Sequence, residues 1–150
     1  MKYCTLRILL LSFLAVAVMG VASTVAQDEG HGGRPLKADL SGAAEVPSPG
    51  DPDGSGEIEL TVNPGQGEIC YDLTLSGVDN VTGAHIHHGG PEENGDPVVS
   101  LETPSAGSAS DCVQVDRELA KAILKNPSDY YVNVHNAEFP NGAVRGQLAM

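Results

Sequence analysis

The sequence is short of aromatic residues and of positive charge. It has no tryptophan and only two phenylalanines, one of them in the N-terminal apolar run. We therefore expect a modest hydrophobic core, which a disulfide or a bound metal would help to stabilise. Eight Lys and Arg stand against 20 Asp and Glu, so the formal net charge is −12. Such an acidic surface repels nucleic acid and anionic lipid, and we expect neither as a partner.

The motifs of several enzyme classes are also missing. The chain has no Gly-x-Ser-x-Gly elbow, phosphate-binding loop, His-Glu-x-x-His motif or paired catalytic carboxylates, which disfavours a hydrolase. The spaced acids of residues 51–57 (DPDGSGE) lack the register of a calcium loop, and a turn explains them better.

Residues 1–26 have the pattern of a secretory signal peptide. Lys2 and Arg7 form a positive region before an apolar run, and small residues lead to a cleavage site before Gln27. Loss of these two positive charges would change the net charge from −12 to −14. A retained membrane anchor is the alternative, because residues 6–26 are nearly long enough to span a bilayer. We expect a secreted or periplasmic (extracytoplasmic) protein that does not associate with the membrane after cleavage.

Signal removal would leave two cysteines, Cys70 and Cys112. In an exported domain this number predicts one disulfide, worth roughly 3–4 kcal/mol by chain entropy. Both cysteines lie out of the apolar phase of their segments, so a bridge between sheet faces is expected. A metal-binding or free thiol pair is the weaker alternative, because the spacing is not Cys-x-x-Cys.

The mature chain reads as a polar, Gly-rich linker (residues 27–35) followed by one domain (residues 36–150). Period-two alternation predicts strands over residues 57–62, 68–76, 130–136 and 143–148. One short helix is expected after Asp116, the N-cap candidate, and it should end at Asn126 and Pro127. Short alternating strands with one helix indicate an all-β sandwich or barrel.

The histidines form the strongest candidate site. His85 and His87 are two residues apart, so on a strand their imidazoles share one face. His135 and Arg145 also fall on the non-core phase of their predicted strands. If these strands are neighbours, three imidazoles converge and leave an open coordination position, which suits copper or zinc. His88 is out of phase and is an optional ligand. The alternative is that the histidines only hydrogen-bond to turn backbone and hold no metal.

Several segments together resemble the CHRD domain, first named from chordin: residues 40–47 (LSGAAEVP), 83–87 (GAHIH), 95–99 (GDPVV), 130–135 (YYVNVH) and 142–148 (GAVRGQL). The resemblance covers residues 36–150. It implies an exported, immunoglobulin-like Greek-key β-sandwich or barrel. An extracellular or envelope protein would be the natural partner of such a module, and the oligomeric state is left open.

The histidine pattern is also distantly similar to the copper half of copper/zinc superoxide dismutases. This resemblance implies that His85, His87 and His135 bind copper, and that Arg145 attracts an anion such as superoxide. No counterpart of that family's bridging histidine or zinc ligands is present. Three functions therefore stand side by side: a copper-binding module, a metal-free interaction or matrix module, and a dismutase-like copper enzyme.

Overall fold

The computed structural model describes residues 32–150. The predicted signal peptide, Cys4 and most of the predicted linker lie outside the described residues. The first strand already begins at Arg34, so the last two residues of the predicted linker belong to the sheet. Within residues 32–150, no helix has the length and apolar character needed to cross a membrane.

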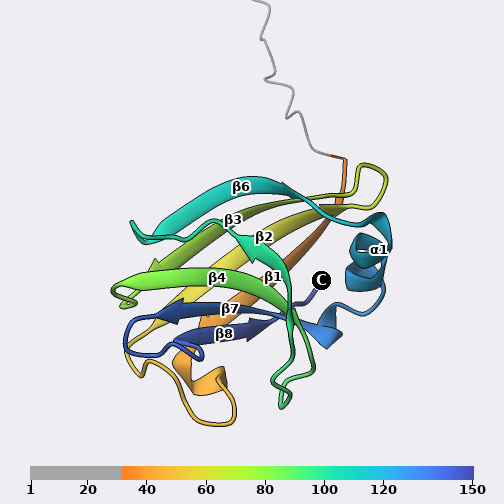
Figure 1. Ribbon diagram of the computed structural model, residues 1–150. Coiled ribbons are helices and arrows are strands. Elements are labelled where there is room, and N and C mark those ends of the chain that lie inside the picture. Colours follow the sequence, from red (N-terminus) through yellow and green to blue (C-terminus); the bar gives the residue numbers. More distant parts are fainter. Residues whose placement is uncertain (1–31) are drawn as a thin grey trace, which may run out of the picture.

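The described chain consists of β-strands with one α-helix (Figure 1). The elements are β1 (Arg34–Ser41), β2 (Ser55–Asn63), β3 (Glu68–Ser76), β4 (Val81–His88), β5 (Pro97–Leu101), β6 (Ser108–Gln114), α1 (Arg117–Lys125), β7 (Tyr130–Asn136) and β8 (Val144–Gln147), with short 3-10 helices at Gly42–Ala44 and Pro127–Asp129. The strands predicted over residues 68–76 and 130–136 are confirmed to the residue, whereas β2 is longer and β8 is shorter than predicted.

The eight strands form one antiparallel sheet in the order β5-β4-β7-β8-β1-β2-β3-β6. The sheet folds over so that β4 and β7 face β2 and β3, and α1 lies at one end (Figure 1). The connections β3–β4, β5–β6 and β6–β7 each pass from one half of this nearly closed sheet to the other. The predicted all-β class with one short helix is confirmed.

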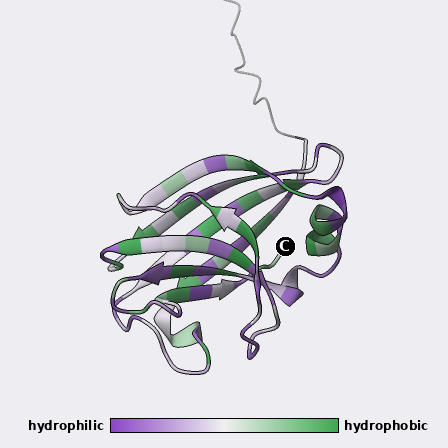
Figure 2. Cartoon of the chain, viewed as in Figure 1, coloured by the Kyte–Doolittle hydropathy of each residue, from purple (hydrophilic) through white to green (hydrophobic). Residues whose placement is uncertain are grey.

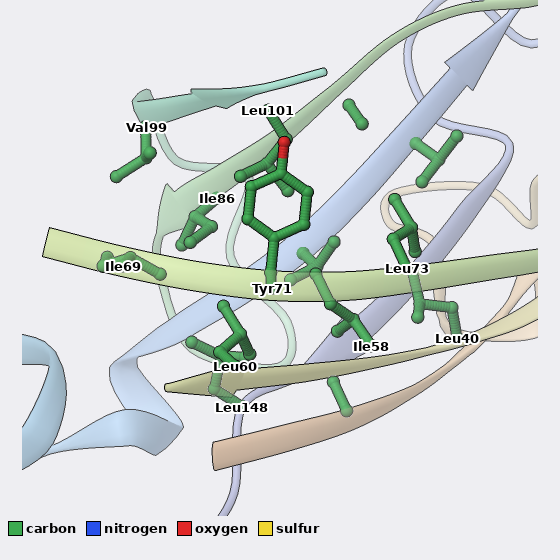
Figure 3. Packing of buried hydrophobic residues seen from close by; sticks show 14 of the residues in the cluster. Leu40, Ile58, Leu60, Ile69, Tyr71, Leu73, Ile86, Val99, Leu101 and Leu148 are labelled. Carbon is green, nitrogen blue, oxygen red and sulfur yellow. The ribbon is translucent and has the colours of Figure 1, made fainter. Parts of the chain in front are cut away.

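Strict alternation of apolar and polar residues places the core between the two halves of the sheet. The bands of opposite hydropathy along the strands follow this period (Figure 2). Ile58 from β2, Leu73 from β3 and Ile86 from β4 are fully buried, and burial of each such side chain contributes about 1.5–3 kcal/mol. The ring of Tyr71 crosses the core towards Leu101 (Figure 3), and its hydroxyl accepts the backbone N–H of Glu102 at 2.7 Å.

Helix α1 carries the chain from β6 to β7. Its bounds agree with the sequence pattern, and it buries Ala120 and Ile123 against the end of the sheet. The predicted N-cap residue Asp116 precedes the helix but makes no side-chain capping hydrogen bond. The apolar stripe, and not the cap, therefore holds the helix in place.

The predicted disulfide between Cys70 and Cys112 is present. The two residues are directly opposite each other on β3 and β6, with their Cα atoms 3.9 Å apart. The bond therefore joins neighbouring strands of one sheet, and the expected bridge between sheet faces is wrong. The two cysteines have the same phase in the alternating pattern because residues paired across two adjacent strands point to the same face of the sheet.

Candidate metal centre

Three neighbouring strands, β4, β7 and β8, carry the predicted site. β7 pairs with β4 on one side and with β8 on the other. The register places His85 opposite Asn133, and Asn133 opposite Arg145. Since alternate residues of a strand share a face, this pairing brings the polar-phase residues of all three strands onto one outer surface.

His85, His87 and His135 lie together on this surface. Their ring centroids are 5.2 to 6.0 Å apart, and one nitrogen from each ring lies within 4.8 Å of the others. An ion at this cluster would bind each nitrogen at about 2.0–2.1 Å. The predicted convergence of the three imidazoles is therefore observed.

Hydrogen bonds define which nitrogen atoms are available. Nδ1 of His87 lies 2.9 Å from the carbonyl oxygen of Gly95, and Nδ1 of His135 lies 3.2 Å from that of Pro140. A carbonyl only accepts, so Nδ1 donates in both rings and Nε2 keeps its lone pair. Among the described residues, Nε2 of His87 and Nδ1 of His85 are buried without a hydrogen-bond partner. Nε2 is therefore available to an ion in His87 and His135, and His85 has its Nδ1 without a hydrogen-bond partner.

Burial lowers the pKa of all three histidines below 6.5. For His87 the charges of His85 and Arg145 lower the pKa further, whereas the bond to Gly95 and the charge of Asp96 oppose the change. Near neutral pH the rings are therefore neutral, which is the form that binds a transition metal.

Tyr131 separates Arg145 from the histidines. The Tyr131 ring stacks on His87 with centroids 4.9 Å apart and an interplanar angle of 17°. The guanidinium carbon of Arg145 lies 3.4 Å from the centroid of the same ring. Because β7 lies between β4 and β8, the aromatic ring stands between the imidazole and the guanidinium.

Arg145 is only 1% exposed, and its Nη2 donates to the carbonyl oxygen of Gly90 at 2.7 Å. This environment differs from the one expected for an anion-attracting residue, because the cation is buried and braces the β4–β5 loop. Gln147 adds to the bracing, since its Nε2 donates to the carbonyl oxygens of Gly89 and Ser128, each at 2.7 Å.

Sequence reasoning missed Glu45, a residue that is only 6% exposed. Burial raises its pKa to about 7, although the charge of Arg145 and a hydrogen bond from Asn133 act in the opposite direction. Nδ2 of Asn133 donates to Oε2 of Glu45 at 3.4 Å. The available signal was an acid between apolar residues in the segment 40–47 (LSGAAEVP).

Other candidate ligands are not part of this cluster. His88 is exposed, and its ring packs against Tyr130 at 5.1 Å, away from the three histidines. Glu68, Cys70 and Cys112 also lie close together, but the disulfide occupies both sulfur atoms. The group of His85, His87 and His135 is therefore the one that fits a metal among the described residues.

The sequence was compared with models of known protein families, with curated proteins and with solved structures. A model of the CHRD domain matches residues 36–148, which include β2 to β8, most of β1 and the three histidines. No curated protein and no solved structure matches the chain, so the similarity to copper/zinc superoxide dismutases receives no support from them. The match spans most of the sequence, and the chain belongs to the CHRD domain family.

Proposed function

We propose that this protein is an extracytoplasmic CHRD module that binds one transition-metal ion, with copper favoured, through His85, His87 and His135. One observation carries the proposal: the three imidazole rings lie close together in tautomers that can bind a metal ion. Three neutral imidazoles converge. In His87 and His135 the bond from Nδ1 to a carbonyl oxygen leaves Nε2 available, and Nδ1 of His85 has no hydrogen-bond partner.

The donor set fits copper. Imidazole nitrogen is a ligand for both copper and zinc, and Cu(II) binds most tightly among the divalent first-row ions at a given site. Three protein ligands leave one coordination position open to water or another small molecule. Copper would supply a one-electron redox centre there. The module would therefore buffer copper or support redox chemistry outside the cytoplasm.

The acidic composition supports the same conclusion. With a formal net charge of −12, the protein attracts cations to its surface and raises their local concentration. The acidic groups need not be ligands for this effect. It favours uptake of a cation over uptake of an anion such as superoxide.

The test uses tag-free mature protein isolated from its own compartment and then stripped and reloaded. We expect one equivalent of copper by elemental analysis and a rise in melting temperature on loading. The double variant H85A/H135A should lose the copper, whereas H88A should keep it, because His88 lies outside the cluster. Absence of copper from the wild type, or unchanged binding in the double variant, would refute the proposal.

A metal-free interaction module is the second candidate. Its support is that His87 and His135 already hold the carbonyl groups of Gly95 and Pro140, which braces two loops without any ion. In this case copper would not change the melting temperature. A binding protein from the same compartment would be recovered with wild-type protein and with the histidine variants alike.

A further inference from the structure

We infer that Tyr131 is a positioning residue that holds the imidazole of His87 in its metal-binding orientation and tautomer. The inference rests on the proposed function, because it concerns how one of the proposed ligands is prepared. Its basis is the set of contacts that Tyr131 makes to His87, to Gly95 and to Arg145.

The first contact restrains the plane of the His87 ring. Stacking at a centroid distance of 4.9 Å and an angle of 17° leaves little room for rotation about the bond to the ring. Both side chains are buried, with Tyr131 fully so and His87 8% exposed. The aromatic face of Tyr131 thus forms one wall of the site.

The second contact restrains the hydrogen-bond partner of His87. The Tyr131 hydroxyl accepts the backbone N–H of Gly95 at 3.1 Å and lies 3.4 Å from the Gly95 carbonyl oxygen, to which it can donate. The same carbonyl oxygen accepts Nδ1–H of His87 at 2.9 Å. Tyr131 therefore fixes both the ring and the carbonyl group that determines its tautomer.

Gly95 allows this arrangement because it has no side chain. A Cβ atom there would lie 1.6 Å from the carbonyl oxygen of His88, so any other residue would displace the segment. The backbone of Gly95 can then lie close to both rings. The loop therefore keeps the Gly95 carbonyl oxygen beside Nδ1 of His87.

Arg145 holds Tyr131 from the other side. Its guanidinium lies on the ring, a cation–π contact, and its Nη2 donates to Gly90 in the loop that also contains Gly95. The sequence of contacts therefore runs from Arg145 through Tyr131 to His87. Groups that orient a metal-binding histidine in this way typically change metal affinity by about 10–100-fold when removed.

The experiment compares Tyr131→Leu and Tyr131→Phe with the wild type. Copper affinity is measured by competition with a chelator, and the His87 tautomer is measured by nitrogen NMR of the imidazole in metal-free protein. We expect Tyr131→Leu to lose about 10–100-fold in affinity and to show a mixture of tautomers. Tyr131→Phe keeps the stack and loses only the hydroxyl contacts to Gly95, so its loss of affinity should be smaller.

Tyr71→Phe is the matched control. Tyr71 is also buried, and its hydroxyl also accepts a backbone N–H, but it lies in the core away from the histidines. The control should lose stability without a change in copper affinity or in the His87 tautomer. The electron paramagnetic resonance spectrum of bound Cu(II) should change in the Tyr131 variants and not in the control.

The outcomes separate the two proposals. A wild type that binds no copper overturns the proposed function and this inference together. Copper binding by the wild type, with equal affinity and the same His87 tautomer in folded Tyr131→Leu, overturns the inference alone. If Tyr131→Leu does not fold, Tyr131→Phe decides the question. An unchanged affinity and an unchanged spectrum in that variant would overturn the inference that Tyr131 positions His87 through its contacts to Gly95.

Discussion

The buried carboxyl group of Glu45 should make the stability of the metal-free protein depend on pH near neutrality. Burial raises its pKa from 4.5 to about 7 in the folded state. The folded protein therefore binds this proton more tightly than the unfolded chain does. The contribution to stability is complete below pH 4.5 and is lost as the pH rises through 7.

The substitution Glu45→Gln removes the ionisation and keeps the size of the side chain. A difference of about 2.5 in pKa, at about 1.4 kcal/mol for each unit, corresponds to about 3 kcal/mol. The free energy of unfolding of the variant, relative to the wild type, should therefore increase by this amount between pH 4.5 and pH 8.

The assay is equilibrium unfolding in urea of metal-free protein at several pH values between 4.5 and 8. The histidines titrate in the same range in both proteins, so their contribution cancels in the difference. Glu57→Gln is the control, because Glu57 is exposed on β2 and the same chemical change occurs there in water. Parallel stability curves for the wild type and Glu45→Gln would refute the reasoning that Glu45 is buried as a neutral acid.

Two further predictions concern the disulfide and the histidines. Replacing Cys70 and Cys112 by serine should lower the free energy of unfolding by about 4 kcal/mol, because the bond closes a loop of 42 residues. Urea unfolding of the double variant measures this loss. A change below about 1 kcal/mol would contradict the prediction. Burial lowers the pKa of His85, His87 and His135 below 6.5, so the folded state resists their protonation, and the stability of the metal-free protein should fall as the pH decreases from 6.5 through the lowered pKa values. Proton NMR titration of the imidazoles checks this, and pKa values at or above 6.5 in the folded protein would contradict it.

The identity of the strands and the direction of their side chains could be predicted from the sequence. β3 has the expected bounds because a strand with one buried face must alternate, and the alternation is visible within a few residues. The sequence of β7 alternates as well, although nearly all of its residues are buried. The placement of His85, His87 and His135 on the polar phase followed from the same local rule. The disulfide could also be predicted without knowledge of the fold, because signal removal would leave two cysteines in an exported domain.

Which strands are neighbours could not be predicted in this way. The expectation that the cysteines bridge two sheet faces was wrong because phase gives the direction of a side chain and not the strand beside it. The burial of Arg145 and Glu45 was also missed, because it depends on loops that cover the outer face of β7 and β8. Gly90 is far from Arg145 in the sequence, and Asn133 is far from Glu45.

The sequence by itself therefore determined the strand periodicity, the family and the chemical types available for a site. Only the tertiary structure decided that the three imidazoles meet, that Tyr131 lies between His87 and Arg145, and that Glu45 is enclosed. The physical reason is that side-chain direction follows from the backbone of a single strand, whereas contact between strands depends on the packing of the whole sheet around its core.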